Sequence, residues 1–129
     1  MSVLDENVPP SQRRLLHSWH VSVRHVGYGI GRKGLQDDEI IPFLLTLRRP
    51  TFFTLDAGFF KPRLCHERYG LVYMSVTQSE AAAFVRRLLR HPQFNTQAKR
   101  MGAVVRLSHA SLSVWRLHAE EAAFVDWVK

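Results

Sequence analysis

The regular alternation of short apolar runs with amphipathic segments is the feature of this sequence that most constrains its fold. The short runs are rich in β-branched and aromatic residues, as strands are, and the longer segments carry apolar residues at helical spacing. The expected elements are a strand at 2–4, a helix at 10–18, a strand at 20–26, a helix opening at Asp37 with an apolar face reaching Leu47, and strands at 51–54 and 71–76 with a helix at 79–90 after them. Strands that alternate with helices form parallel sheets covered on both faces. The sequence therefore predicts an α/β fold, a three-layer α/β/α sandwich with a mainly parallel central sheet.

The last third of the chain has a different pattern. Residues 103–107 and 112–117 both alternate apolar with polar positions, and Ser108-His109-Ala110 separates them. This pattern predicts a closing C-terminal β-hairpin. A chain of 129 residues with 46% hydrophobic content is long enough for one well-buried core. We therefore expect one domain over 1–117 and a C-terminal tail over 118–129 that forms one more helix.

Charge and cysteine content narrow the classes of partner. Eighteen Lys and Arg residues against eleven Asp and Glu residues give a net charge of +7, which favours nucleic acid or an acidic protein as partner. Cys65 is the only cysteine, so neither an intramolecular disulfide nor a cysteine-based zinc site can form. The longest apolar runs fall well short of the roughly 20 residues that cross a bilayer. We therefore expect a soluble, cytoplasmic protein without a membrane partner.

Acidic residues gather at three places that the predicted topology brings together. Two clusters follow strands and one opens a helix: Asp5 and Glu6, then Asp37, Asp38 and Glu39, then Asp56. Parallel strands place their ligand sites beyond their carboxyl ends, so Asp5 and Asp56 should share one edge of the sheet, with Glu39 facing it from the first helical turn. Converging carboxylates repel one another unless a hard cation or a raised pKa relieves them. Taken singly, these residues also suit turns and helix starts, with Asp37 as an N-cap.

Three short motifs carry a family resemblance over nearly the whole chain. Leu4-Asp5-Glu6-Asn7 with Pro9-Pro10, then Asp37-Asp38-Glu39-Ile40, then Thr54-Leu55-Asp56 with Phe59 resemble the signature of the PIN-like family. The resemblance implies a PIN-like, Rossmann-like fold and a ribonuclease that depends on Mg²⁺ or Mn²⁺, often the toxin of a bacterial toxin–antitoxin pair. It makes Asp5, Glu39 and Asp56 the catalytic acids and metal ligands, with Asp37 as a fourth metal ligand.

One position departs from the family pattern. The family commonly has a further acid two residues after the one matched by Asp56, and this chain has Gly58 there. The departure leaves two functions open. One is a metal-dependent endoribonuclease, and the other is a catalytically weak or inactive binding module for nucleic acid or an acidic protein partner.

Basic side chains near the acids are expected to hold the RNA backbone, and we assign this role to Arg32, Lys33, Lys61 and Arg63. The stretch from Gly29 to Gly34 matches a dinucleotide-binding pattern, but the acidic helix start that follows would repel a phosphate. We therefore expect no organic cofactor there. The implied partners are RNA or other single-stranded nucleic acid and an antitoxin protein, with homodimer formation left open.

Overall fold

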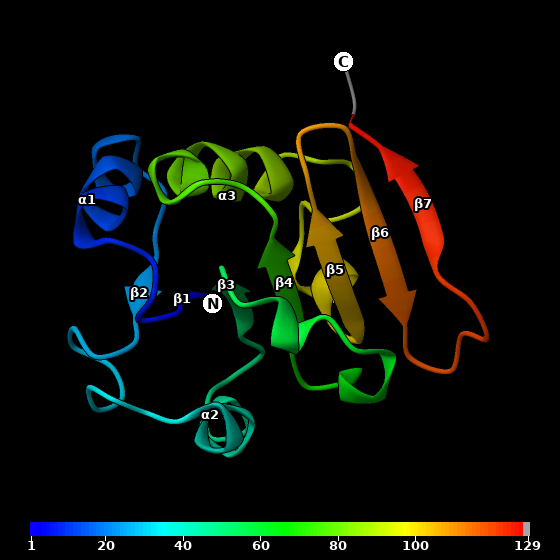
Figure 1. The fold of residues 1–129 in the computed structure, drawn as a ribbon, viewed down its shortest axis with the longest axis horizontal. Helices are drawn as coiled ribbons and strands as arrows, with labels where there is room; N and C mark the ends of the chain where they lie inside the picture. Colours follow the sequence, from blue (N-terminus) through cyan, green and yellow to red (C-terminus); the bar gives the residue numbers. More distant parts are fainter. Residues whose placement is uncertain (128–129) are drawn as a thin grey trace.

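The computed structural model describes residues 1–127 and contains one mixed, seven-stranded sheet (Figure 1). The strand order is β2-β1-β3-β4-β5-β6-β7. The five strands from β2 to β5 in this order run parallel, and β6 and β7 run antiparallel to their neighbours. The strands are β1 (Ser2–Leu4), β2 (Arg24–His25), β3 (Thr51–Thr54), β4 (Gly70–Met74), β5 (Ala103–Leu107), β6 (Ser111–Arg116) and β7 (Ala123–Asp126).

Helices cover both faces of the parallel part of the sheet. The α-helices are α1 (Pro10–Ser18), α2 (Asp37–Leu44), α3 (Ala81–Leu89) and α4 (Gln97–Arg100). Short 3-10 helices are η1 (Ala57–Phe59), η2 (Pro62–Leu64) and η3 (Gln78–Glu80). Figure 1 shows α1 and α3 together on one face of the sheet and α2 on the other. The predicted α/β sandwich with a mainly parallel sheet is confirmed at this level.

Two apolar cores fill the spaces between these layers. One packs Leu16 of α1 and Leu88 of α3 against Phe53 of β3, and the other packs Leu44 of α2 against Phe52. Consecutive residues of β3 thus point to opposite faces, and both rings are completely buried. Strands buried on both faces read as continuous apolar runs, which explains why the sequence identified β3 without ambiguity.

The N-terminal elements agree with the sequence except in the second strand. The strands at 2–4 and 51–54 and the helix at 10–18 lie at the predicted residues. The strand predicted over 20–26 is reduced to Arg24 and His25, which pair with Val3 and Leu4. His20 has a positive φ of 62° and turns the chain after α1, and β1 itself is only three residues long. A long second strand would therefore have little to pair with.

The prediction of a helix in the C-terminal tail is wrong. Residues 123–126 form β7, which pairs antiparallel with β6, and the sheet thus continues beyond residue 117. His118 has a positive φ of 68° in the turn that reverses the chain between these strands. β5 and β6 pair antiparallel across residues 108–110, so the last three strands form a meander (Figure 1). The final two residues of the predicted tail, 128–129, lie outside the described residues.

No helix within residues 1–127 has the length and hydropathy that a membrane span requires.

Candidate functional site

After β1 the chain adds β2 on one side of that strand and then adds β3 on the other side, so the direction in which strands are added changes at β1. β2 lies on one side of β1 and β3 lies on the other, so the chain passes from one face of the sheet to the other on its way through α1, β2 and α2 (Figure 1). Ligands of open α/β sheets bind in the crevice outside the carboxyl ends of the strands at such a switch point. Asp5 follows β1 directly, and Asp56 lies two residues beyond β3. The structure thus places both acids at the predicted edge.

Thr54, the last residue of β3, joins these two acids. Its hydroxyl donates to Asp5 Oδ2 over 2.7 Å and accepts from the Asp56 backbone N–H at 3.0 Å. The Asn7 side-chain amide donates to the same hydroxyl at 3.3 Å. The Asp5 Oδ1 atom accepts from the Glu6 backbone N–H at 2.7 Å. Thr54 is completely buried, so this network fixes the Asp5 carboxyl against β3.

The carboxyls of Asp5, Asp37 and Asp56 share one electrostatic environment. Burial raises the pKa of Asp5, and the charges of Asp37 and Asp56 raise it further, against the lowering effect of its hydrogen bonds from Thr54. The pKa of Asp37 is raised by partial desolvation and then by the nearby charged carboxyl of Asp56. Asp56 is itself oriented, because its Oδ1 accepts from the Gly58 N–H at 2.8 Å. Asp5 and Asp56 are linked through Thr54, and the charge of Asp37 acts on both of them.

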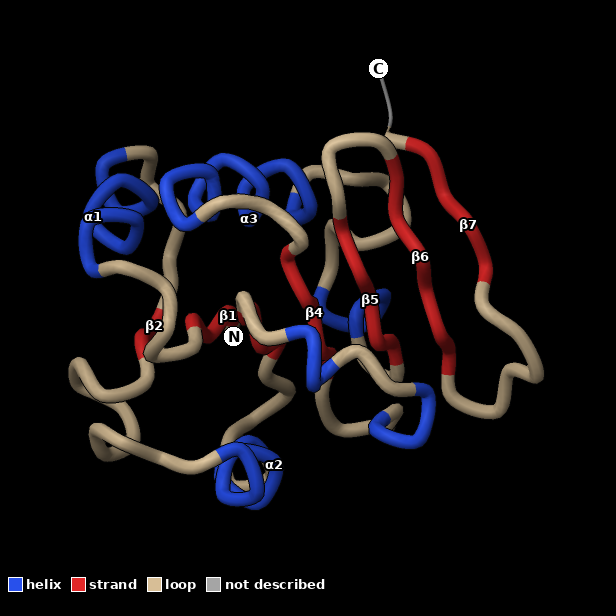
Figure 2. The backbone as a smooth tube through the Cα atoms, viewed as in Figure 1, coloured by secondary structure: helices blue, strands red, loops and turns tan. Residues whose placement is uncertain are grey.

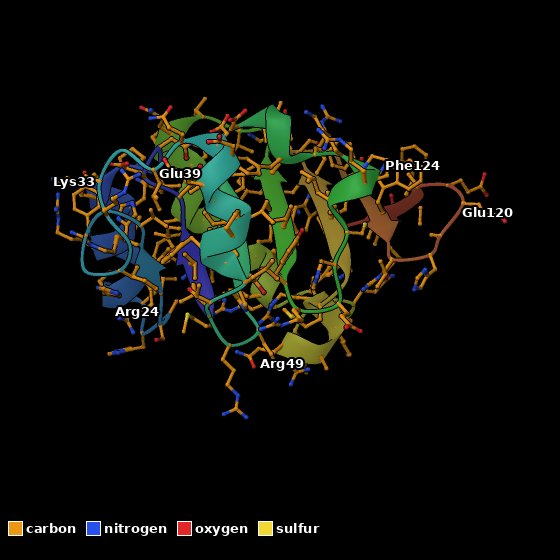
Figure 3. The ribbon with its side chains drawn as sticks, turned by 90° about the horizontal axis from the view of Figure 1, so that it is seen from below. Arg24, Lys33, Glu39, Arg49, Glu120 and Phe124 are labelled. Carbon is orange, nitrogen blue, oxygen red and sulfur yellow. The ribbon has the colours of Figure 1, made fainter. Side chains whose placement is uncertain are left out.

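Glu39 does not join them, and its prediction as a catalytic and metal-binding residue is not supported. Its Oε1 accepts from the Gln36 backbone N–H at 2.9 Å, and its other oxygen pairs with Arg32. The Gln36 N–H and the Arg32 side chain lower the pKa of Glu39. Figure 3 shows Glu39 at the start of α2, near the loop that carries Lys33.

The cause is a capping box at the start of α2. The N-cap is Gln36 rather than Asp37, and Glu39 occupies the third helical position, whose side chain bonds back to the N-cap backbone. Asp37 is therefore the first helical residue and is available to meet Asp56. Glutamate three residues after the N-cap is the part of this arrangement that the sequence shows, whereas glutamine is not among the residues preferred at the N-cap.

The acids fit a weakly held, hydrated cation better than a closed metal cage. Within residues 1–127 no three His, Cys, Asp or Glu side chains are arranged to hold one metal ion. Mg²⁺ keeps several waters and commonly binds proteins through one or two carboxylates together with substrate phosphates. Asp37 and Asp56, whose charges influence each other, together with Asp5 would supply such a donor set.

Gly58 faces this cluster. A Cβ atom built at Gly58 would lie 3.1 Å from Asp56 Oδ1, and the backbone there is not in the left-handed region. A side chain at this position would therefore begin next to the Asp56 carboxyl. A side chain would need only a small shift of the Asp56 carboxyl to enter.

The predicted RNA-binding residues divide into two groups. Lys61 and Arg63 line a hollow of about 320 Å³ together with Asp37 and Asp38, and the Lys61 charge lowers the pKa of Asp37. They lie next to the acids, as an RNA-holding role requires. Both side chains are on exposed residues after η1.

Arg32 and Lys33 belong instead to the irregular loop between β2 and α2 (Figure 2). Arg32 is paired with Glu39, and the Lys33 ammonium lies 4.8 Å from the centroid of the Tyr28 ring. The carboxylate of Glu6 holds this loop by accepting from the Gly34 N–H at 2.8 Å. The Arg32 guanidinium therefore forms its ion pair within the protein, with Glu39.

Sequence reasoning missed Thr54, Asn7 and His25. His25 is buried, with Nε2 3.1 Å from the Asp5 carbonyl oxygen and Nδ1 3.2 Å from Arg13 Nη1. Because a guanidinium only donates, Nδ1 accepts and Nε2–H donates to Asp5, so the ring is neutral. Burial and then the Arg13 charge lower the pKa of His25. Asn7 and Thr54 lie within the motifs that carry the resemblance, but their mutual bonds have no sequence signal.

The site combines converging carboxylates, which attract a divalent cation, with neighbouring cationic side chains, which attract phosphate. Hydrogen bonds hold the Asp5 carboxyl, the charge of Asp56 acts on Asp37, and Lys61 lines a hollow together with Asp37. Such a combination suits the binding and hydrolysis of a phosphodiester. Comparisons with protein-family models, with curated proteins and with solved structures found no match to this chain.

Proposed function

We propose that this protein is a Mg²⁺- or Mn²⁺-dependent endoribonuclease of PIN-like type. The observation that carries the proposal is that Asp5 and Asp56 lie past the carboxyl ends of β1 and β3 and are joined by Thr54, with the charge of Asp37 acting on both. The parallel strand order from β2 to β5 supports the Rossmann-like, PIN-like assignment of the fold. The resemblance of the motifs also supports a toxin role in the cytoplasm, with an antitoxin as protein partner.

Each side chain has a role under this proposal. Asp37 and Asp56 hold the cation, and Asp5, whose pKa is raised, accepts a proton from the attacking water. Lys61 and Arg63 hold the RNA phosphates in the adjacent hollow. Thr54 and Asn7 keep Asp5 in position. The bound cation supplies Lewis-acid polarisation of the phosphate and a lowered pKa for its water.

A second candidate function is a binding module that holds RNA without cutting it. Two observations favour it: Glu39 is occupied by Arg32, and Gly58 stands where an acid is expected. Removing carboxylates from a hard-cation site lowers the negative charge of the site and its affinity for the cation. Under this alternative the chain binds RNA in Mn²⁺ and leaves it intact.

The deciding experiment is an RNA cleavage assay with purified native protein and the variants Asp56→Asn and Glu39→Gln. We expect cleavage of single-stranded RNA in Mn²⁺ but not in EDTA, and a rate at least about 100-fold lower in Asp56→Asn. Glu39→Gln is the matched control, because glutamine preserves the capping box and should keep the rate. RNA binding without cleavage would establish the binding module, and cleavage that survives both EDTA and Asp56→Asn would contradict the proposal.

A further inference from the structure

A second basic surface lies on α3, and its lining shares no residue with the acidic site. Three arginines, Arg86 and Arg87 of α3 and its C-cap Arg90, line a hollow of about 470 Å³ whose remaining walls are Ala83, His91, Pro92 and Trp127. We call this surface the arginine hollow. Among residues 1–127 no acidic side chain lines it, and the arginines make its electrostatic potential positive.

Aromatic rings order two of these guanidinium groups. The Arg86 guanidinium carbon lies 3.7 Å from the centroid of a Trp19 ring, and that of Arg87 lies 4.3 Å from Trp127. The Trp127 ring is fixed in turn, because its indole N–H donates to the Ser108 carbonyl at 2.7 Å. Stacking uses the flat face of a guanidinium and leaves the N–H donors at its edge available.

These donors have no partner within residues 1–127. The two ion pairs of that part of the chain are Arg32 with Glu39 and His109 with Glu80, and no side-chain hydrogen bond there comes from the three arginines of the hollow. Arginines in the last turn of a helix suit its dipole. The helix dipole does not explain why Arg86 and Arg87 stack on tryptophan rings. It also does not explain why three like charges, which repel one another, lie close together at the end of α3.

We propose that the arginine hollow binds the phosphate backbone of single-stranded RNA. The choice of RNA rests on the proposed function, and the hollow extends it by naming a contact surface separate from the acids. Guanidinium edges match phosphate oxygens in a bidentate geometry. An acidic protein would need apolar contacts at the centre of its interface, and here the Arg87 guanidinium already lies over the Trp127 ring that lines the hollow.

The test measures binding of a labelled single-stranded RNA by fluorescence anisotropy in EDTA, where the acidic site binds no cation. We compare native protein with the double variant Arg86→Gln/Arg87→Gln and with the control Arg48→Gln/Arg106→Gln, which removes the same charge from exposed positions elsewhere. We expect the first pair to weaken binding about tenfold and to reduce the log–log salt slope by about 1.4, since each single-strand phosphate contact contributes about 0.7. The control should change affinity less than about twofold.

Equal losses in both double variants, each confirmed as folded by circular dichroism, would overturn the inference. Competition by poly-L-glutamate as effective as that by RNA of equal charge would also overturn it, and would assign the hollow to an acidic protein. The outcome is independent of catalysis. If Mn²⁺-dependent cleavage fails while the arginine pair still governs RNA affinity, only the proposed nuclease is withdrawn. If the arginine pair has no effect while cleavage persists, only the hollow is withdrawn.

Discussion

The Thr54 hydroxyl donates a 2.7 Å hydrogen bond to Asp5 Oδ2, and this bond joins the ends of two neighbouring strands, β1 and β3. The same oxygen accepts from the backbone of Asp56. One buried side chain therefore sets the relative position of two acids that lie 51 residues apart in the sequence.

Thr54→Val should destabilise the protein by about 1–3 kcal/mol, because it leaves buried polar partners on Asp5 and Asp56 unsatisfied while preserving shape. Urea unfolding measures this loss. Thr46→Val is the control, since the exposed Thr46 hydroxyl donates only to the Phe43 carbonyl and its loss should cost less than about 0.5 kcal/mol. Similar losses in both variants would show that the Thr54 hydrogen bonds contribute no more to stability than the single exposed bond of Thr46.

Asp37→Asn should raise the melting temperature in EDTA at neutral pH, because it removes repulsion between Asp37 and Asp56. The pKa of Asp37 is raised in the folded protein above its ordinary value of 3.8, so the folded state holds the proton more tightly. The native protein therefore loses stability as the pH rises through the folded pKa, and the advantage of Asp37→Asn should vanish below about pH 3.8.

Melting curves from pH 3 to 7 measure this difference. The control is Glu120→Gln, an exposed residue far from α2, which should not change the pH profile. Added Mn²⁺ should reverse the order of the melting temperatures, since a cation stabilises only the protein that binds it. A variant less stable than native at every pH would contradict the convergence of these carboxyls.

Gly58→Asp should tighten Mn²⁺ binding about tenfold by adding a carboxylate to a site that has too few. The backbone at Gly58 accepts a side chain without left-handed strain, and the new Cβ would lie 3.1 Å from Asp56 Oδ1. Isothermal titration calorimetry measures the affinity, with Gly58→Asn as the neutral variant of equal size. Identical affinities for the Asp and Asn variants would mean that this position does not reach the cation.

The pKa of Glu80 is lowered in the folded protein, in contrast to the raised pKa of Asp37. The bond with His109, then the bonds from Thr77, lower the pKa of Glu80 from 4.5 to about 2. Its ionised form therefore stabilises the folded protein above pH 4.5, and this contribution is lost as the pH falls toward 2. In acid titrations followed by circular dichroism, Glu80→Gln should show a shallower loss of stability between these values. Glu121→Gln, at an exposed position, should titrate like the native protein.

The parts of the fold that the sequence predicts are those decided by local pattern. β3 is buried on both faces and α1 begins at Pro10, so apolar runs and helix-start signals were sufficient there. The meeting of Asp5 and Asp56 follows from strand order alone, because both lie past the carboxyl ends of adjacent parallel strands.

The errors arise where long-range contacts or backbone bonding decide the structure. Glu39 has the right residue type and spacing for a ligand, but its carboxylate is taken by the Gln36 backbone and by Arg32. β7 is mostly exposed, with Phe124 81% accessible, and it lacks a clear apolar face. It is a strand because β6 offers it a partner, and such pairing is not visible in the segment itself.

Glu6 and Glu39 together give the glycine-rich loop a mechanical connection to the site. Glu6, directly after Asp5, holds Gly34, and Glu39 holds Arg32 from the first turn of α2. Both attachments, at Arg32 and Gly34, lie near the end of the loop that leads into α2. One connects the loop to the residue beside Asp5, and the other connects it to the helical turn that carries Asp37. A molecule that displaces this part of the loop would break both attachments.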